Sequence, residues 1–251
     1  SNTSVSGLER LYELVGYPTT GRVLRRLTVC IDRFIAISSA VKRIYVEHGL
    51  EAERVDVVPN MYDPSFSTPG EIPEETANSR TMVLYVGELS ERKGVEYLIR
   101  SLQSLDDSYR LRLVGNGDAG DSLRRLTERL GLTSRVDFAD RVPYDRVGAQ
   151  YAMADVFVHP GVWPEPFGRT VMEAMQASLP VVCTEVGGPA DIVPDPKLRC
   201  PPRDPAALAT AIQRAFECHQ RYGERNRAHI EQEFSPSSVT DAILDVYELV
   251  M

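Results

Sequence analysis

The sequence of 251 residues contains no apolar run that approaches the ~18–20 residues of a membrane-spanning helix. It has only four cysteines, without a Cys-x-x-Cys pair or a histidine at zinc-ligand spacing, so we expect free thiols and no zinc site. Basic residues are also outnumbered, because the sequence has 28 Lys and Arg residues against 36 Asp and Glu residues, which gives a net charge of -8. That balance excludes a general nucleic-acid binder. Without a signal-peptide pattern, these features predict a soluble, cytoplasmic protein.

What the sequence does contain, from Arg80 onward, is an alternation of strand-length apolar runs with stretches of helical period. This pattern is typical of an α/β protein with a doubly wound parallel sheet. The expected strands are 82–87, 111–115, 136–138, 155–159 and 180–184. The expected helices are 95–102, 123–130, 144–153 and 168–177, with further helices beginning near Asp204, Tyr222 and Ser237.

The first eighty residues have a different character. They predict a strand at 34–37, a helix at 39–47 and a second strand at 55–58, a unit too small to bury a core alone. Residues 64–79 carry three prolines and Gly70 and are predicted to form a linker. The chain begins with Ser, and residues 1–6 are small and polar, as in a tag remnant or a cleavage site. We therefore expect a fragment of a longer protein.

The segment EPFGRTVME, Glu165–Glu173, is the main candidate for a binding site. It lies between a predicted strand and a predicted helix, where ligands of open parallel sheets bind. Gly168 would let a ligand approach the backbone, and the first amides of the helix, at Arg169 and Thr170, favour a phosphate. Glu165 precedes the helix and Glu173 lies inside it, so the two carboxylates can accept hydroxyls at opposite ends of one ligand.

A simpler interpretation makes Glu165 a helix cap and Glu173 a solvated helix residue. However, the neighbours of Glu173 on both sides are apolar, namely Val171, Met172, Ala174 and Met175. A carboxylate in such a setting is costly unless a partner satisfies it, which favours the ligand-binding interpretation. His159, the histidine nearest to the segment, is interpreted as a packing residue at a strand end rather than a general base.

The stretch GNGDAG, Gly115–Gly120, supports a different hypothesis. It matches the G-x-G-x-x-G pattern between a strand and a helix, and Asp137 follows where a ribose-binding acid is expected, so an NAD(P)-binding Rossmann domain is the alternative. That fingerprint normally opens such a domain at its first strand. Here a complete strand–helix unit, with the segment ERKG at Glu91–Gly94, comes earlier.

An ordered series of motifs resembles the family 4 glycosyltransferases of the GT-B fold, from about Phe34 to the C-terminus. Besides the two glutamates separated by seven residues, it comprises VPNMYD, VGELSERKG, LVGNGD, FADRV, YAMADVFVHP, AMQASLPVV and GGPADIV. The resemblance implies a retaining, metal-independent transferase without a cofactor, whose donor is a UDP-sugar or a GDP-sugar and whose acceptor is a hydroxyl of a glycan, a lipid or a small molecule. It also implies that the isolated fragment is inactive, or is a non-catalytic nucleotide-sugar-binding module.

The resemblance assigns roles to individual residues. Glu173 would bind the ribose, Glu165 and Lys93 would be the catalytic pair at the sugar and the diphosphate, and Val142 would lie beside the base. The implied substrate-binding set is Arg92, Lys93, Val142, Glu165, Phe167, Gly168, Arg169, Thr170 and Glu173. One departure concerns the diphosphate, because Glu88 stands where the family often has Arg; we expect either that Glu88 lies away from the phosphates with Arg92 in its place, or that the donor carries less charge.

The implied domains are an N-terminal acceptor-domain remnant at 1–63, the linker at 64–79, the nucleotide-sugar-binding domain at 80–235 and a helix at 236–251 that crosses back to the N-terminal part. A peripheral membrane contact through the missing part of the N-terminal domain is among the partners that the resemblance allows.

Overall fold

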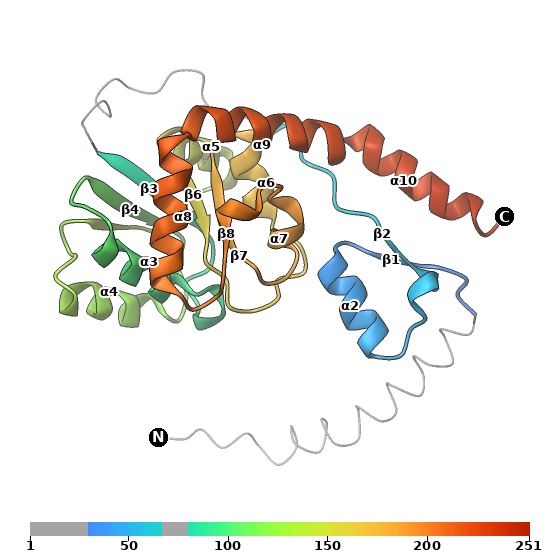
Figure 1. Ribbon diagram of the computed structural model, residues 1–251, viewed down its shortest axis with the longest axis horizontal. Helices are drawn as coiled ribbons and strands as arrows, with labels where there is room; N and C mark the ends of the chain where they lie inside the picture. Colours follow the sequence, from blue (N-terminus) through green and yellow to red (C-terminus); the bar gives the residue numbers. More distant parts are fainter. Residues whose placement is uncertain (1–29, 67–79) are drawn as a thin grey trace, which may run out of the picture.

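The computed structural model describes residues 30–66 and 80–251. Within these ranges the chain forms a six-stranded parallel sheet covered by helices and a small two-stranded unit under the last helix (Figure 1). The backbone N–H of Ser39 in the small unit donates to Oδ2 of Asp191 in the larger body over 2.7 Å. Most of the predicted linker, residues 67–79, lies outside the described residues. The predicted α/β class and doubly wound parallel sheet are confirmed.

The elements of the larger body follow the expected alternation. Its strands are β3 (Thr81–Val86), β4 (Tyr109–Val114), β5 (Val136–Ala139), β6 (Val156–His159), β7 (Val181–Thr184) and β8 (Arg199–Cys200). Its helices are α3 (Val95–Ser101), α4 (Gly120–Arg129), α5 (Tyr144–Ala152), α6 (Arg169–Gln176), α7 (Pro189–Ile192), α8 (Pro205–Glu217) and α9 (His219–Glu233), followed by α10 (Pro236–Glu248). Short 3-10 turns are η3 (Glu91–Lys93), η4 (Leu102–Ser104) and η5 (Pro196–Leu198). The sequence analysis did not anticipate α7 and β8, which are among the shortest of these elements.

The strand order of the larger sheet, β5-β4-β3-β6-β7-β8, locates the place where a ligand fits. All neighbouring pairs are parallel, and the chain winds outward from β3 in one direction and then from β6 in the other. The order therefore reverses between β3 and β6. In such sheets the loops after these two strands leave a crevice at the carboxyl edge, which is the usual binding position.

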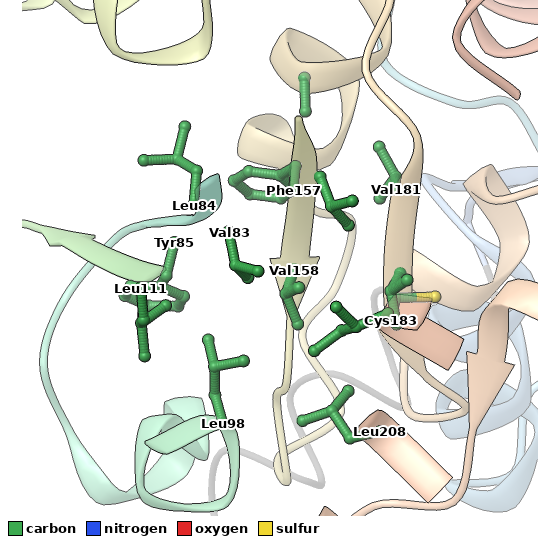
Figure 2. Packing of buried hydrophobic residues seen from close by; sticks show 14 of the residues in the cluster. Val83, Leu84, Tyr85, Leu98, Leu111, Phe157, Val158, Val181, Cys183 and Leu208 are labelled. Atoms are coloured by element: carbon green, nitrogen blue, oxygen red, sulfur yellow. The ribbon is translucent and has the colours of Figure 1, made fainter. Parts of the chain in front are cut away.

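Both faces of the larger sheet are covered by helices, which explains why its strand sequences are apolar throughout. Register pairs Leu84 with Phe157 and Phe157 with Val181, so these side chains share one face of the sheet, while Val158 lies on the other. Helices α6 and α9 contact one another on one side, and α3 contacts α8 on the other. Figure 2 shows the strand side chains packed together with Leu98 of α3 and Leu208 of α8. A parallel sheet covered on both faces needs such continuous apolar strands.

The smaller body consists of β1 (Phe34–Ala36), α2 (Ser39–Glu47), η1 (Ala52–Arg54) and β2 (Val55–Val57). Its contact with α10 is a separate apolar cluster of Val58, Val239 and Val246, with Ala242 and Ile243 packed against it. Val239, Ile243 and Val246 of this helix thus find apolar partners, whereas Leu249 remains 64% exposed. Figure 1 shows α10 reaching from the larger body across the smaller one.

Candidate active site

The two loops at the point of strand reversal are packed directly against each other. The backbone N–H of Val162, after β6, donates to the carbonyl of Arg92, after β3, over 3.0 Å. Gly94 has φ +64, and a Cβ atom there would lie 2.1 Å from the carbonyl oxygen of Pro160. Glycine is therefore required at Gly94, and this close approach fixes the neighbouring Lys93 beside the loop that carries Glu165.

Glu165 is held by two partners on one oxygen. Its Oε2 accepts from Nζ of Lys93 at 2.5 Å and lies 2.9 Å from Nε2 of His159. Burial raises the pKa of Glu165, but the hydrogen bonds and charges of His159 and Lys93 outweigh burial and lower that pKa to about 2. Since an ionised carboxylate only accepts hydrogen bonds, Nε2 of His159 must carry the proton between them.

This arrangement leaves capacity for a ligand. Among the described residues no hydrogen bond is made to Oε1 of Glu165, and Lys93 has three donors, of which one is used. Glu165 and Lys93 line a cavity of about 210 Å³ together with Arg92, Trp163 and Pro166. The simpler alternative, that Glu165 caps the helix, is wrong, because α6 has no side-chain cap.

Glu173 is buried, with 7% of its surface exposed, so the interpretation as a solvated helix residue is wrong. The Tyr151 hydroxyl donates to its Oε2 at 2.8 Å, and Nη2 of Arg169 lies 3.9 Å from its Oε1. Burial raises the pKa of Glu173, and the Tyr151 hydrogen bond opposes that rise. Glu173 and Arg169 line a cavity of about 390 Å³ with Tyr144 and the segment 60–64.

The start of α6 lies between these two glutamates. Gly168 is its cap residue and has no side chain to bond the first amides, which leaves Arg169 N–H and Thr170 N–H available to an anion. The open side of Gly168 is not available, however, because a Cβ there would lie 3.1 Å from Cγ of Pro189. The predicted approach of a ligand to the backbone at Gly168 therefore has to come from the side of the first α6 amides.

The remaining predicted residues have other environments. The Phe167 side chain is buried and contacts Phe234, with ring centroids 6.2 Å apart, so only its backbone can face a ligand. Nη2 of Arg92 donates to Oε2 of Glu88 at 2.7 Å. Glu88 therefore lies beside Arg92, and both expectations for this pair, which concern the phosphates of a bound donor, stay predictions. Val142 lines a cavity of about 380 Å³ that Glu88 also borders.

The structure thus distributes the predicted set over three cavities at the carboxyl edge of the sheet. Arg92, Lys93 and Glu165 share one, Arg169 and Glu173 share a second, and Val142 lines the third. The two glutamates face separate cavities, so one ligand has to pass the start of α6 to reach both. Phe167, Gly168 and Thr170 line none of these three cavities.

The sequence analysis did not predict the roles of three side chains at the site. Tyr151 satisfies Glu173, and Tyr144 lies seven residues earlier on α5 and lines the same cavity; this two-turn spacing was a usable signal. His159 was interpreted as a packing residue. It is indeed buried, at 4% exposure, but it also contacts Glu165.

The glycines of GNGDAG serve the packing of loops. A Cβ at Gly115 would lie 2.0 Å from the carbonyl oxygen of Gly87, and one at Gly117 would lie 2.3 Å from that of Leu89. These glycines follow β4, which is not the strand beside the reversal of strand order. They let the loops after β3 and β4 approach each other, and this accounts for the pattern without a dinucleotide.

Three further features bear on the expectations from composition. All four cysteines are free thiols. Within residues 30–66 and 80–251, no group of three or more His, Cys, Asp or Glu side chains is arranged to hold a metal ion. Across the same ranges, every helix is too short or too polar to cross a membrane.

Comparison with known proteins identifies relatives. The family described as "Glycosyl transferases group 1" matches residues 71–232. The uncharacterized glycosyltransferase MJ1607 of Methanocaldococcus jannaschii is 33% identical over 177 residues, which cover 68% of this chain and 45% of that protein. The O-antigen chain mannosyltransferase B of Escherichia coli is 30% identical over 175 residues, covering 66% and 45%. The chain spans about half the length of these curated relatives.

Among solved structures, Anabaena Alr3699/HepE in complex with UDP-glucose has a TM-score of 0.74 at 25% identity and covers 87% of this chain and 63% of that one. A glycosyltransferase from Rickettsia africae has a TM-score of 0.78 at 18% identity, with 92% and 67% covered, and supports the fold alone.

Proposed function

Because the chain belongs to the group 1 glycosyltransferases, we propose that it binds a nucleoside diphosphate sugar and serves the transfer of its hexose to a hydroxyl acceptor. The NAD(P)-binding alternative is abandoned, since the family assignment spans the GNGDAG segment. The observation that carries the proposal is the Glu165 carboxylate, ionised and held by Lys93 and His159 at the strand reversal, with one oxygen directed to no described partner. The relative from Anabaena was solved with UDP-glucose, which supports a UDP-sugar as the donor; a GDP-sugar is the other candidate.

The transferred sugar belongs next to Glu165 in this proposal. A carboxylate that stays ionised is a strong acceptor for sugar hydroxyls, and Oε1 is the atom that would accept them. His159 and Lys93 hold the carboxylate in one orientation, so little ordering is needed when the sugar binds. Glu165 and Lys93 are therefore proposed as the catalytic pair.

The diphosphate belongs between Lys93 and the start of α6. The unused donors of Lys93 and the first amides of α6, at Arg169 and Thr170, would offset the charge that develops as the diphosphate leaves. We propose that these groups of the chain, rather than a metal ion, supply this stabilisation. Arg92 is already bonded to Glu88 and contributes less unless that pair opens.

The nucleoside belongs in the two remaining cavities. Oε1 of Glu173 would accept from the ribose, because Tyr151 already occupies Oε2. The base would lie near Val142, two residues before α5, whose first residue Tyr144 lines the Glu173 cavity. The cavities of Glu173 and Val142 thus border the same end of α5, as adjacent ribose and base positions require.

Several finer points extend the proposal beyond the family assignment. Transfer with retention, a glycan, lipid or small-molecule acceptor, a cytoplasmic location and a peripheral membrane contact through a further N-terminal part follow from the resemblance alone. The domain boundaries after residues 63, 79 and 235 also follow from the resemblance. So does a helix from residue 236 that returns to the N-terminal part, which the contact of α10 with Val58 supports. Because the chain spans about half of its relatives, we propose that it binds the donor but turns it over slowly or not at all. A non-catalytic binding module is the second candidate.

Calorimetric titration with UDP, GDP and NAD tests the donor assignment. We expect binding of one diphosphate and none of NAD; tight NAD binding without a response to either diphosphate would contradict the proposal. Glu173→Ala should cost about 1.5–3 kcal/mol of nucleotide affinity through the lost ribose contact. The matched control is Glu128→Ala, an exposed glutamate of α4, which should leave the affinity unchanged. Transfer assays on the same chain distinguish a slow enzyme from a binding module.

A further inference from the structure

A fourth cavity, of about 600 Å³, is larger than any of the three described above and contains no predicted site residue except Arg92. It runs over α3 toward α4 and toward the segment that precedes α8. Its floor is apolar and includes the buried residues Val95, Leu123 and Leu126. We name it the arginine groove after the four arginines that border it, Arg92, Arg100, Arg129 and Arg203.

The arginines of the groove come from four different parts of the chain. Arg92 belongs to η3, Arg100 to α3, Arg129 to α4, and Arg203 precedes α8. Two carboxylates, Glu91 and Glu96, also border the groove, so it has an excess of positive charge in a chain whose net charge is -8. Within the described residues, Arg100, Arg129 and Arg203 form no ion pair. Three guanidinium groups are therefore available to a ligand.

Two observations on the walls of the groove add to the charge. Burial raises the pKa of Tyr97, as do the hydrogen bond and the charge of Glu96, and the charges of Arg203 and Arg100 oppose that rise. Both guanidinium groups therefore act on one phenol together with one carboxylate. Arg203 also has φ +61, a backbone conformation that non-glycine residues rarely adopt and that often marks a functional position. Two arginines thus share this part of the groove with one carboxylate, that of Glu96, and the positive charge stays in excess there.

Trp163 joins the groove to the Glu165 cavity, because it lines both. It is the single tryptophan of the sequence and its surface is 58% exposed. Its carbonyl accepts from the backbone N–H of Glu165 at 2.7 Å, so the loop that carries the indole is tied to the candidate active site. An exposed indole combines an apolar face with a polar edge, which suits the mixed surface of a sugar ring.

We propose that the arginine groove binds an anionic saccharide, one whose successive sugar units carry carboxylate or phosphate groups. Guanidinium groups pair with both kinds of anion through two parallel hydrogen bonds. Because the arginines stand on separate elements, they match charges spread along a chain better than the compact charge of one diphosphate. The volume lies within the range of about 300–1,000 Å³ for small-molecule sites. The binding of such a saccharide to the groove does not depend on the proposed function. Only its approach to the donor sugar, past Trp163, rests on that function.

Calorimetry on the full 251-residue chain tests this, with trigalacturonate as the carboxylated probe, maltotriose phosphorylated at one end as the phosphate-bearing probe, and neutral maltotriose as the size-matched control. We expect trigalacturonate to bind at least about tenfold more tightly than maltotriose, with an affinity that falls as salt rises, and the probe with one terminal phosphate to bind less tightly than trigalacturonate. The double variant Arg100→Gln/Arg203→Gln should lose about tenfold or more of this affinity. The control Arg125→Gln/Arg221→Gln removes two exposed arginines outside the groove and should stay within about twofold of the parent.

Equal affinity for maltotriose and the charged probes, no charged-probe binding at millimolar concentration, or an unchanged affinity in the groove variant would overturn the inference. Inorganic phosphate that binds as tightly as the saccharides would also overturn it, by reducing the groove to a simple anion site. Displacement of the charged probes by UDP would overturn the inference too, because it would show that the groove belongs to the donor site. A chain that failed to bind UDP or GDP but bound these probes would refute the proposed donor site and leave the groove intact.

Discussion

At the scale of single residues, two glutamates eight positions apart occupy opposite environments. Burial dominates at Glu173, where Tyr151, Arg169 and Tyr144 compensate only in part and the pKa rises. At Glu165 two partners overcome burial and the pKa falls to about 2. Carboxyl groups whose environments separate their pKa values in this way commonly take different roles. The contrast supports Glu165 as the charged contact near the reacting sugar and Glu173 as a contact to the nucleoside.

His159 offers a direct test of how Glu165 is held. His159→Leu removes the Nε2 contact at 2.9 Å and leaves Lys93 as the main partner. We expect the affinity for the nucleotide sugar to fall by about 1–2 kcal/mol, because the carboxylate is less well ordered, while the affinity for the free diphosphate stays the same. His159→Gln keeps an N–H donor and should recover part of the loss. Calorimetry with both ligands checks this; equal losses for the two would refute a role at the sugar.

Glu165 also predicts a pH dependence of stability. Its pKa of about 2 in the folded chain lies below the ordinary value of 4.5, so the folded state takes up this proton less readily than the unfolded state. The resulting stabilisation, at most about 3 kcal/mol, is complete above about pH 5 and is lost as the pH falls from 4.5 toward 2. Urea unfolding across this range should show a shallower decline for Glu165→Gln than for Glu128→Gln. Parallel declines would contradict the prediction.

At the scale of elements, the loops after β3 and β6 form the site by packing on each other. Gly94→Ala should disturb this contact, because its Cβ would meet the Pro160 carbonyl at 2.1 Å. Gly131→Ala is the matched control, since Gly131 has a similar φ of +69 but no atom within 4 Å of the added Cβ. We expect about 1 kcal/mol of destabilisation for the control and at least about 1–2 kcal/mol more for Gly94→Ala.

Chemical unfolding of both variants and titration with the bound diphosphate provide the measurement. Only Gly94→Ala should also weaken nucleotide binding, because it shifts Lys93 from Glu165. Similar stabilities and affinities for the two variants would show that the loop contact does not matter.

The elements themselves were predictable from the sequence, whereas the contacts between them were only partly so. Apolar runs and helical period located β3 to β7 and most helices, because a sheet covered on both faces requires them. The ion pair of Lys93 with Glu165 joins residues 72 positions apart, and nothing local announces it. The packing of Pro189 against the Cβ side of Gly168 was likewise not predictable from the sequence around Gly168. A glycine in the sequence indicates that another group packs closely against the backbone, but it does not indicate which group.

At the scale of the whole molecule, α10 joins the two bodies. Val239 of this helix is 3% exposed and packs with Val58 and Val246. Val239→Asp buries a charge in that cluster and should cost about 2–4 kcal/mol of local stability, with faster hydrogen exchange in residues 34–58 and a nearly unchanged larger sheet. Leu244→Asp on the same helix replaces a residue that is 52% exposed and should have little effect. Exchange that accelerates equally in both bodies would contradict this division.

The two crossings between the bodies meet at one place. The backbone N–H of Tyr62 donates to the carbonyl of Phe234 over 2.9 Å, just before α10 begins. This hydrogen bond therefore joins the segment that leaves the smaller body to the segment that returns to it. Because residues 60–64 of this junction also line the Glu173 cavity, any change in the position of the smaller body would change the width of that cavity.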